Sequence, residues 1–295
     1  MTELGAIDWM AGLTRHDQGL EPMRIGDEAH KELFCRALLE THDPYKPAVI
    51  DWPRLSDEAR NRLVSLPIWN IAVQTEGKAS RRVLAYADLV AGDDWLRRAV
   101  ELNAFEEARH KQVLSNLVEA YGIALAPEPD YPPLRDIERA FMVAGFSECI
   151  DSFFAFGLFE LGRRSGFFPA ELVDTFEPVI HEEARHILFF VNWAAWRRAH
   201  TSWWKRPWFE ARVIGVWLFL AWERLGFAKG IGEEMPADSN FTVTGVSAVG
   251  IDVTLGQMID ICLAENDRRL GPYDKRLLRP RFVPALARFA RRFMR

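Results

Sequence analysis

The string EEARH occurs twice in this chain, and its residue types are those of a metal site. On an α-helix, residues three positions apart lie on one face, about 5–6 Å apart at Cβ. Glu107 and His110 therefore point the same way, and so do Glu183 and His186. A carboxylate and an imidazole presented together make half of a divalent-metal site. Two pairs on two helices would supply both halves of a dinuclear site.

Such a site needs one further carboxylate from each of two other helices. The helical segment that begins at position 68 carries Glu76, which is the only acidic residue between positions 59 and 87. A lone acid on an apolar helix face is costly to bury unless it is paired or bound to a metal. The midpoint between Glu76 and Glu107 falls on a predicted turn, so a helical hairpin would place the two at equal depth.

The second extra carboxylate should come from the helix predicted at about 136 to 164. The midpoint of Glu148 and Glu183 falls on the predicted turn at 165–166. The midpoint of Glu160 and Glu183 falls inside a predicted helix instead. We therefore prefer Glu148 and keep Glu160 in reserve. The acids in the body of this helix are Glu148, Asp151 and Glu160.

Helical periodicity dominates the chain, and strand signals are almost absent. The stretch from 240 to 254 is rich in β-branched residues and glycine, and we expect an irregular crossing or a small hairpin there. Further helices are expected on either side of it, at about 208–227 and 255–269. Four long helices are predicted, over about 68–91, 95–121, 136–164 and 170–199.

Local signals set the ends of these helices. The sequence AGDD at 91–94 offers Gly92 as a C-cap and aspartates as N-caps. Pro178 either kinks the fourth helix or marks its true start. We expect one all-α domain over 1–295, a four-helix bundle with flanking helices. Its core spans about 68–199, between an N-terminal extension at 1–67 and a C-terminal helical extension at 200–295.

Composition narrows the function. The net charge of −5 argues against a nucleic-acid partner. Three dispersed cysteines without a CxxC spacing indicate a reducing cytoplasm, and no secretory signal is recognised. The longest apolar stretch, at 213–222, is too short to span a bilayer.

With both motifs and both extra carboxylates in place, residues 68–199 resemble the ferritin-like di-iron carboxylate superfamily. The pattern is most similar to its oxygen-activating branch, which includes the methane monooxygenase hydroxylase, the ribonucleotide reductase small subunit and related N-oxygenases. The motif there is often acidic-Glu-x-Arg-His, and EEARH matches it twice.

The resemblance implies roles for ten residues. Glu106 and Glu182 would each hold the far nitrogen of the opposite motif's histidine, which fixes a metal-bound imidazole. Arg109 and Arg185 would pair with those acids. Two alternatives stay open: Glu106 exchanges roles with Glu107, or the arginines are solvated. The implied metal ligands are Glu76, Glu107, His110, Glu148, Glu183 and His186.

One departure from the family pattern bears on the reaction. The arylamine N-oxygenases carry an extra histidine one turn before the last-helix glutamate, where this chain has Val179. His181 is two residues from Glu183 and points elsewhere, which disfavours arylamine N-oxygenation. The remaining histidines lack partners at metal spacing and are interpreted as structural or surface residues: His16, His30, His42 and His200.

The donor set favours two iron ions, with manganese or a mixed Mn/Fe pair as alternatives, because oxygen and imidazole donors suit these metals. We expect an O₂-activating oxidase or oxygenase with an apolar or aromatic substrate and an external electron donor. Metal handling without an organic substrate and a non-catalytic partner-binding bundle are the rivals. A homodimer is left open.

The C-terminal residues 275–295 contain eight basic residues and no acidic ones. Phe282, Leu286, Phe289 and Phe293 form one helical stripe with the arginines mostly off it. The stripe either packs on the protein's own bundle or on a twin subunit, or it attaches weakly to an anionic membrane or an acidic partner.

Overall fold

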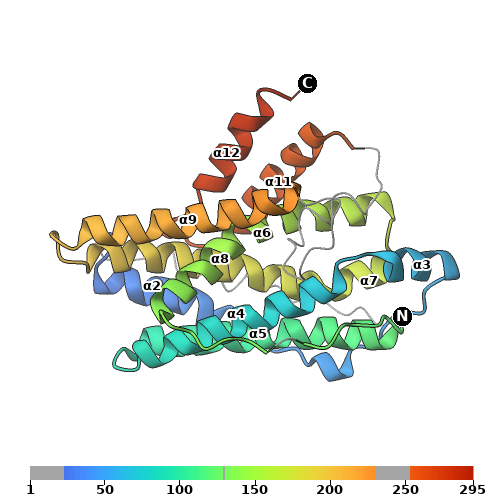
Figure 1. Cartoon of the computed structure of the whole chain (residues 1–295), viewed down its shortest axis with the longest axis horizontal. Coiled ribbons are helices and arrows are strands. Elements are labelled where there is room, and N and C mark those ends of the chain that lie inside the picture. The colour runs from blue at the N-terminus through green and yellow to red at the C-terminus, as the bar shows by residue number, and fades with distance from the viewer. Residues whose placement is uncertain (1–22, 129, 230–252, 295) are drawn as a thin grey trace.

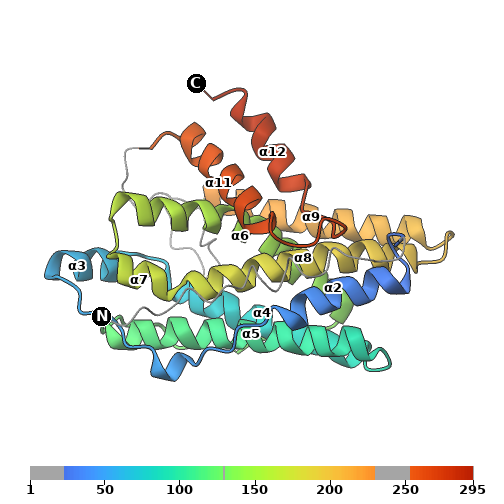
Figure 2. The same cartoon turned by 180° about the vertical axis from the view of Figure 1, so that it is seen from behind.

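The computed structural model describes residues 23–128, 130–229 and 253–294, and the regular secondary structure within these ranges is helical throughout. A bundle of four long helices forms its centre, with α4 against α5 and α6, and α8 against α5 and α6 (Figures 1 and 2). The all-α prediction is confirmed. The four helices are α4 (Trp69–Leu89), α5 (Asp94–Ala120), α6 (Ile137–Ser165) and α8 (Glu177–Ala199).

Three connections join the four bundle helices, and the longest of them is the middle one. A tight turn joins α4 to α5, and residues 166–176, which include the short helix α7 (Ala170–Thr175), join α6 to α8. Residues 121–128 and 130–136 belong to one long crossover that runs back along the bundle (Figure 1). Two helical hairpins linked by a single crossover are the connectivity of a ferritin-like bundle.

Side-chain caps and one glycine define the hairpin ends. Asp93 accepts a hydrogen bond from the Leu96 amide and begins α5, and Asp136 begins α6 in the same way. Gly166 ends α6 with a φ of +63°. Gly92 does not have a positive φ, and α4 already ends at Leu89. The predicted glycine C-cap at 92 is therefore wrong.

The fourth predicted helix is two helices. The chain breaks at Phe176, and α8 begins at Glu177 with Pro178 in its first turn. Proline is tolerated there because the amide it lacks would have no partner within the helix. Of the two interpretations of Pro178, the true helix start is the one observed.

Two glycines on α6 allow close helix contacts. A Cβ atom at Gly145 would lie 2.1 Å from the Phe190 ring of α8, and one at Gly157 would lie 2.4 Å from Cys262 Sγ. Neither position has room for a larger residue. These glycines therefore serve packing against α8 and α11.

The flanking helices cover the bundle on several sides. Helix α2 packs on α5 and α8, whereas α9 and α11 pack on α6 and α12 packs on α11 and α6. Most of the stretch at 240–254 lies outside the described residues. The flanking elements are α2 (Glu28–Glu40), the 3-10 turn η2 (Pro47–Val49), α3 (Asp57–Ser65), α9 (Arg206–Lys229), α11 (Leu255–Leu270) and α12 (Phe282–Arg291).

Of the described helices, only α6 is long and apolar enough to span a membrane by length and composition. It lies inside the bundle and carries Glu148, whose Oε1 atom is buried. These features are those of the core helix of a folded domain.

Candidate metal centre

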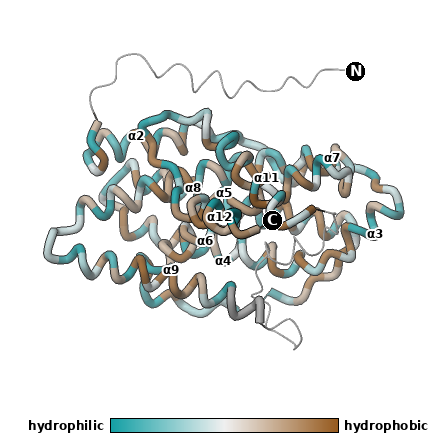
Figure 3. Tube along the Cα trace, turned by 90° about the horizontal axis from the view of Figure 1, so that it is seen from above, coloured by the Kyte–Doolittle hydropathy of each residue, from teal (hydrophilic) through white to brown (hydrophobic). Residues whose placement is uncertain are grey.

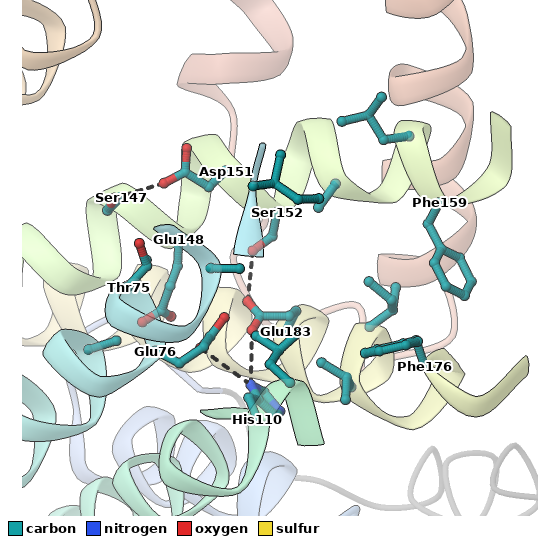
Figure 4. Close-up of a pocket in the computed structure, with 18 of the residues that line it drawn as sticks. Thr75, Glu76, His110, Ser147, Glu148, Asp151, Ser152, Phe159, Phe176 and Glu183 are labelled. Atoms are coloured by element: carbon teal, nitrogen blue, oxygen red, sulfur yellow. Dashed lines mark hydrogen bonds and ion pairs between the residues drawn. The ribbon is translucent and has the colours of Figure 1, made fainter. Parts of the chain in front are cut away.

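The six predicted ligands come from all four bundle helices. Helix α4 carries Glu76, α6 carries Glu148, and the two Glu-x-x-His pairs lie on α5 and α8. Figure 4 shows Glu76, His110, Glu148 and Glu183 pointing toward one another between the helices. Glu107, His110 and His186 are almost completely buried. The structure thus brings together six residues that are dispersed in the sequence.

The ligand atoms fall into two overlapping groups. In each group, one donor atom per residue lies within 4.8 Å of the others. Glu107 belongs to both groups, so its carboxylate could contribute a donor to a cation in either of them. The first group contains Glu76, Glu107, His110 and Glu183, and the second contains Glu107, Glu148 and His186.

Both histidines turn one nitrogen toward the carboxylates of this centre. His110 Nδ1 lies 3.2 Å from a Glu183 oxygen, and His186 Nδ1 lies 2.8 Å from a Glu107 oxygen. Neither contact is aligned as a hydrogen bond. The Nδ1 atoms therefore face the space where a cation would lie.

The Nε2 atom of each histidine contacts a glutamate from the other EEARH copy. His110 Nε2 lies 2.8 Å from Glu182, and His186 Nε2 lies 2.8 Å from Glu106. If each Nε2–H donates to its glutamate, each Nδ1 keeps a lone pair for a metal. Glu106 and Glu182 thus occupy the positions that the family resemblance implies for them.

Arginines complete this outer layer. Arg185 donates to Glu106 at 3.1 Å, and Arg109 donates to Glu182. Both arginines are buried rather than solvated. Burial opposes the charge of Glu106, but hydrogen bonds from His186 and His42 and the charge of Arg185 outweigh it and lower the pKa of Glu106 well below its usual value.

The residues present fit a pair of divalent cations. Among the described residues, four buried atoms at the centre have no hydrogen-bond partner. Buried polar atoms are rarely left unpaired, because each would lose its hydration without compensation. Carboxylate oxygens and imidazole nitrogens are also donors of the right chemistry. The four atoms are Glu107 Oε1, His110 Nδ1, Glu148 Oε1 and His186 Nδ1.

Several carboxylates lie close together at this centre, and burial makes it unfavourable for all of them to be ionised at once. Burial, and then the charges of Glu107 and Glu183, raise the pKa of Glu76 well above its usual value. The pKa of Glu148 is raised by burial and by the charge of Glu107. Protons on these two acids would take the place of metal charge, and metal binding would release them.

The other acids of α6 lie in ion pairs away from this centre. Glu160 accepts hydrogen bonds from Arg163 and Arg164. Asp151 accepts one from Arg224 at 2.6 Å. The residue held in reserve, Glu160, is therefore not among the grouped donors, whereas Glu148 is.

Three residues at this centre were missed in the sequence. His42 Nδ1 lies 2.6 Å from Glu106, the Tyr45 hydroxyl lies 3.5 Å from Glu182, and Ser152 donates to Glu183 at 2.8 Å. The expectation that His42 has only a structural or surface role is thus wrong in part, since it contacts the outer layer of the centre. No periodic pattern marks His42 or Tyr45, because both lie in the loop before η2.

A cavity of about 370 Å³ opens beside the ligands. Leu172, Phe159, Phe168 and Phe176 line one part of it, and Ser147, Asp151 and Arg224 line another. Figure 4 shows Phe159 and Phe176 across an open space from Glu183. Its size is within the range of small-molecule sites.

Val179 occupies the position at which the arylamine N-oxygenases carry their extra histidine, and it also lines this cavity. Val179 lines the wall beside Glu183. His181 instead lies 3.0 Å from the Tyr273 hydroxyl. The structure therefore gives no third histidine next to Glu183 among the described residues.

Comparisons with known proteins are sparse. No family model matches the chain, and no curated protein matches it. A solved structure that is similar is a mutant of an R2-like ligand-binding oxidase with an aerobically reconstituted Mn/Fe cofactor. It is 15% identical, covers 84% of this chain and 95% of that chain, and has a TM-score of 0.43. A likeness this weak says nothing about chemistry, and the fold rests on the helices themselves.

The bundle and its candidate ligands share their arrangement with a known class of proteins. Two hairpins, one crossover, an inward Glu on two helices and Glu-x-x-His on the other two are also found in ferritin-like di-metal carboxylate proteins.

Proposed function

We propose that this protein is a dinuclear metal oxidase or oxygenase that uses O₂ to oxidise an apolar small molecule. The observation that carries this proposal is the position of the cavity, whose wall includes Glu76, Glu107, His110 and Glu183. A substrate bound there would lie directly against the metal ligands. The four ligand carboxylates balance the charge of two divalent ions, for which iron is the first candidate and manganese the second.

Two reduced metal ions in this centre would supply the electrons that activate O₂. The chain's own residues hold and orient the centre. Ser152 fixes Glu183 through its hydrogen bond, while Glu106 and Glu182 fix the two imidazoles. The aromatic wall around Phe159 and Phe176 excludes water and favours an apolar substrate. An external donor would return the electrons.

The cavity also separates this function from metal handling without an organic substrate. Metal storage does not require a cavity of this size beside the ligands, whereas oxidation of a small molecule does. A non-catalytic role is disfavoured because all six candidate ligands are present and four of their buried atoms make no hydrogen bond in the described structure.

Oxygen uptake after anaerobic loading with ferrous iron tests the proposal. We expect two irons per chain, rapid O₂ consumption and a ligand-to-iron absorption band that bleaches on reduction. Ala155 lines the cavity but is not a ligand, so Ala155→Trp should keep both irons and lose turnover of an apolar substrate. Two bound irons without O₂ uptake would contradict the proposal and favour metal handling.

A further inference from the structure

Helix α9 presents a continuous apolar stripe to solvent. Trp208 is 74% exposed, Leu218 66% and Trp222 72%. The stripe recurs at helical spacing and contains no charged residue. Its members are Trp208, Ala211, Ile214, Gly215, Leu218, Ala221 and Trp222.

The opposite face of α9 is apolar as well. Phe209, Val216 and Leu220 are buried where α9 covers the bundle. A helix that is apolar on both faces is normally enclosed on both. The outer face of α9 thus has the composition of a buried surface. None of the described residues covers it.

Helix α12 carries a second stripe of this kind. Phe282, Leu286, Phe289 and Phe293 are 57–74% exposed. The buried side of α12 is formed instead by Val283 and Ala287, which pack with α11 and α6. Of the alternatives for this stripe, packing on the protein's own bundle is seen in the described residues only at Phe282, which contacts α9. Figure 1 shows α12 rising away from the bundle.

The two helices contact each other beside the stripes. The ring of Phe282 on α12 lies 4.6 Å from the ring of Trp217 on α9, a half-buried residue that precedes Leu218 in the sequence but is not part of the first stripe. Figure 3 shows apolar residues recurring along α9. We name the two stripes together the α9–α12 face.

Tryptophan and basic residues border the α9–α12 face. Trp203 and Trp204 are exposed just before α9, and the Lys205 ammonium lies 4.7 Å from the Trp204 ring centroid. On the α12 side, Arg281 and Arg292 are exposed. Within the described parts of the chain, no carboxylate forms an ion pair with Lys205, Arg281 or Arg292.

We propose that the α9–α12 face attaches the protein to an anionic membrane surface. Exposed tryptophans with an apolar body and a polar N–H suit the membrane–water interface, and basic residues beside them attract anionic headgroups. A second copy fits less well, because a two-fold interface would place the same patch on both sides, and the stripes contain no carboxylate to pair with the basic border. This inference goes beyond the proposed oxidase function and does not depend on metal.

Vesicle flotation of the full chain tests the proposal. We expect binding to phosphatidylcholine vesicles that contain phosphatidylglycerol, weak binding to phosphatidylcholine alone, and weaker binding as salt is raised. Brominated lipids should quench tryptophan fluorescence, because the exposed indoles would enter the interface. Absence of flotation at low salt, or equal binding to both vesicle types, would overturn the proposal.

Matched variants locate the contact. Leu286→Glu on α12 and Leu218→Glu on α9 should each lower the vesicle partition coefficient at least tenfold. Leu89→Glu on α4 is the control, since Leu89 is 56% exposed and Leu286 57%. Arg281→Gln with Arg292→Gln should lower partitioning to anionic vesicles roughly 30-fold. If the stripe variants dissociate a dimer and leave flotation unchanged, a second copy covers this face instead.

Discussion

His110 and Glu182 are 72 positions apart in the chain, yet His110 Nε2 and a Glu182 oxygen lie 2.8 Å apart. His186 and Glu106 repeat this contact at 2.8 Å in the opposite direction. Each EEARH copy therefore supplies a histidine to the centre and a carboxylate that fixes the other copy's histidine. This exchange explains why the string is present twice.

The histidines should determine metal content. We expect about two divalent ions per chain after anaerobic loading with ferrous iron, because six donors converge in two groups. The double variant His110→Ala, His186→Ala should lose most of this metal. His200→Ala is the control, since His200 is exposed and its ring lies 3.0 Å from the Trp196 carbonyl at the end of α8. Metal analysis of the three proteins gives the answer, and unchanged content in the double variant would contradict the site.

Helix α6 offers a sharp test of the ligand assignment. Glu148→Ala should abolish rapid O₂ consumption by the ferrous-loaded protein while helical content stays near that of the wild type. Glu160→Ala should consume O₂ normally, because Glu160 pairs with Arg163 and Arg164. Oxygen-electrode traces and circular dichroism measure both properties. The reverse result would show that Glu148 is the wrong residue.

The outer carboxylates should tune metal affinity. Glu182→Gln removes a charge that holds both His110 and Arg109. Loss of such a partner typically weakens metal binding about 10–100-fold. Competition with a chelator measures the change. Glu128→Gln breaks an exposed pair with Lys111 and should leave the affinity as it was; an equal loss there would point to a general charge effect.

His181 should make stability depend on pH. Burial lowers the pKa of His181 from 6.5 to about 4, with the charge of Arg185 acting in the same direction. Between these values the unfolded chain binds a proton that the folded protein does not, so the free energy of unfolding falls as the pH is lowered from 6.5 toward 4. At about 1.4 kcal/mol per pKa unit, the effect is on the order of 3 kcal/mol.

The variant His181→Gln isolates this contribution, because glutamine can still accept a hydrogen bond from the Tyr273 hydroxyl. Urea denaturation at about neutral pH and again about two units lower should show a smaller loss of stability in the variant than in the wild type. Identical losses in the two proteins would show that His181 does not titrate as argued.

The sequence by itself determined the bundle helices and the six candidate ligands. Helical periodicity is local, so the spacing of Glu107 and His110 fixes their shared face before any tertiary contact forms. The depth argument that selected Glu148 over Glu160 is less local, because residues 166–176, which include α7, join α6 to α8, so the packing of these helices also sets their register. Metal binding by these residues stays a prediction.

Only the tertiary structure decided the surroundings of the centre. His42 and Tyr45 reach Glu106 and Glu182 from a loop, and loop positions depend on packing across the whole fold. The exposure of Leu286 likewise could not be predicted from the sequence. Periodicity shows that α12 has an apolar face, but which face meets the bundle depends on how α12 sits on its neighbours, and there Val283 and Ala287 pack inward instead.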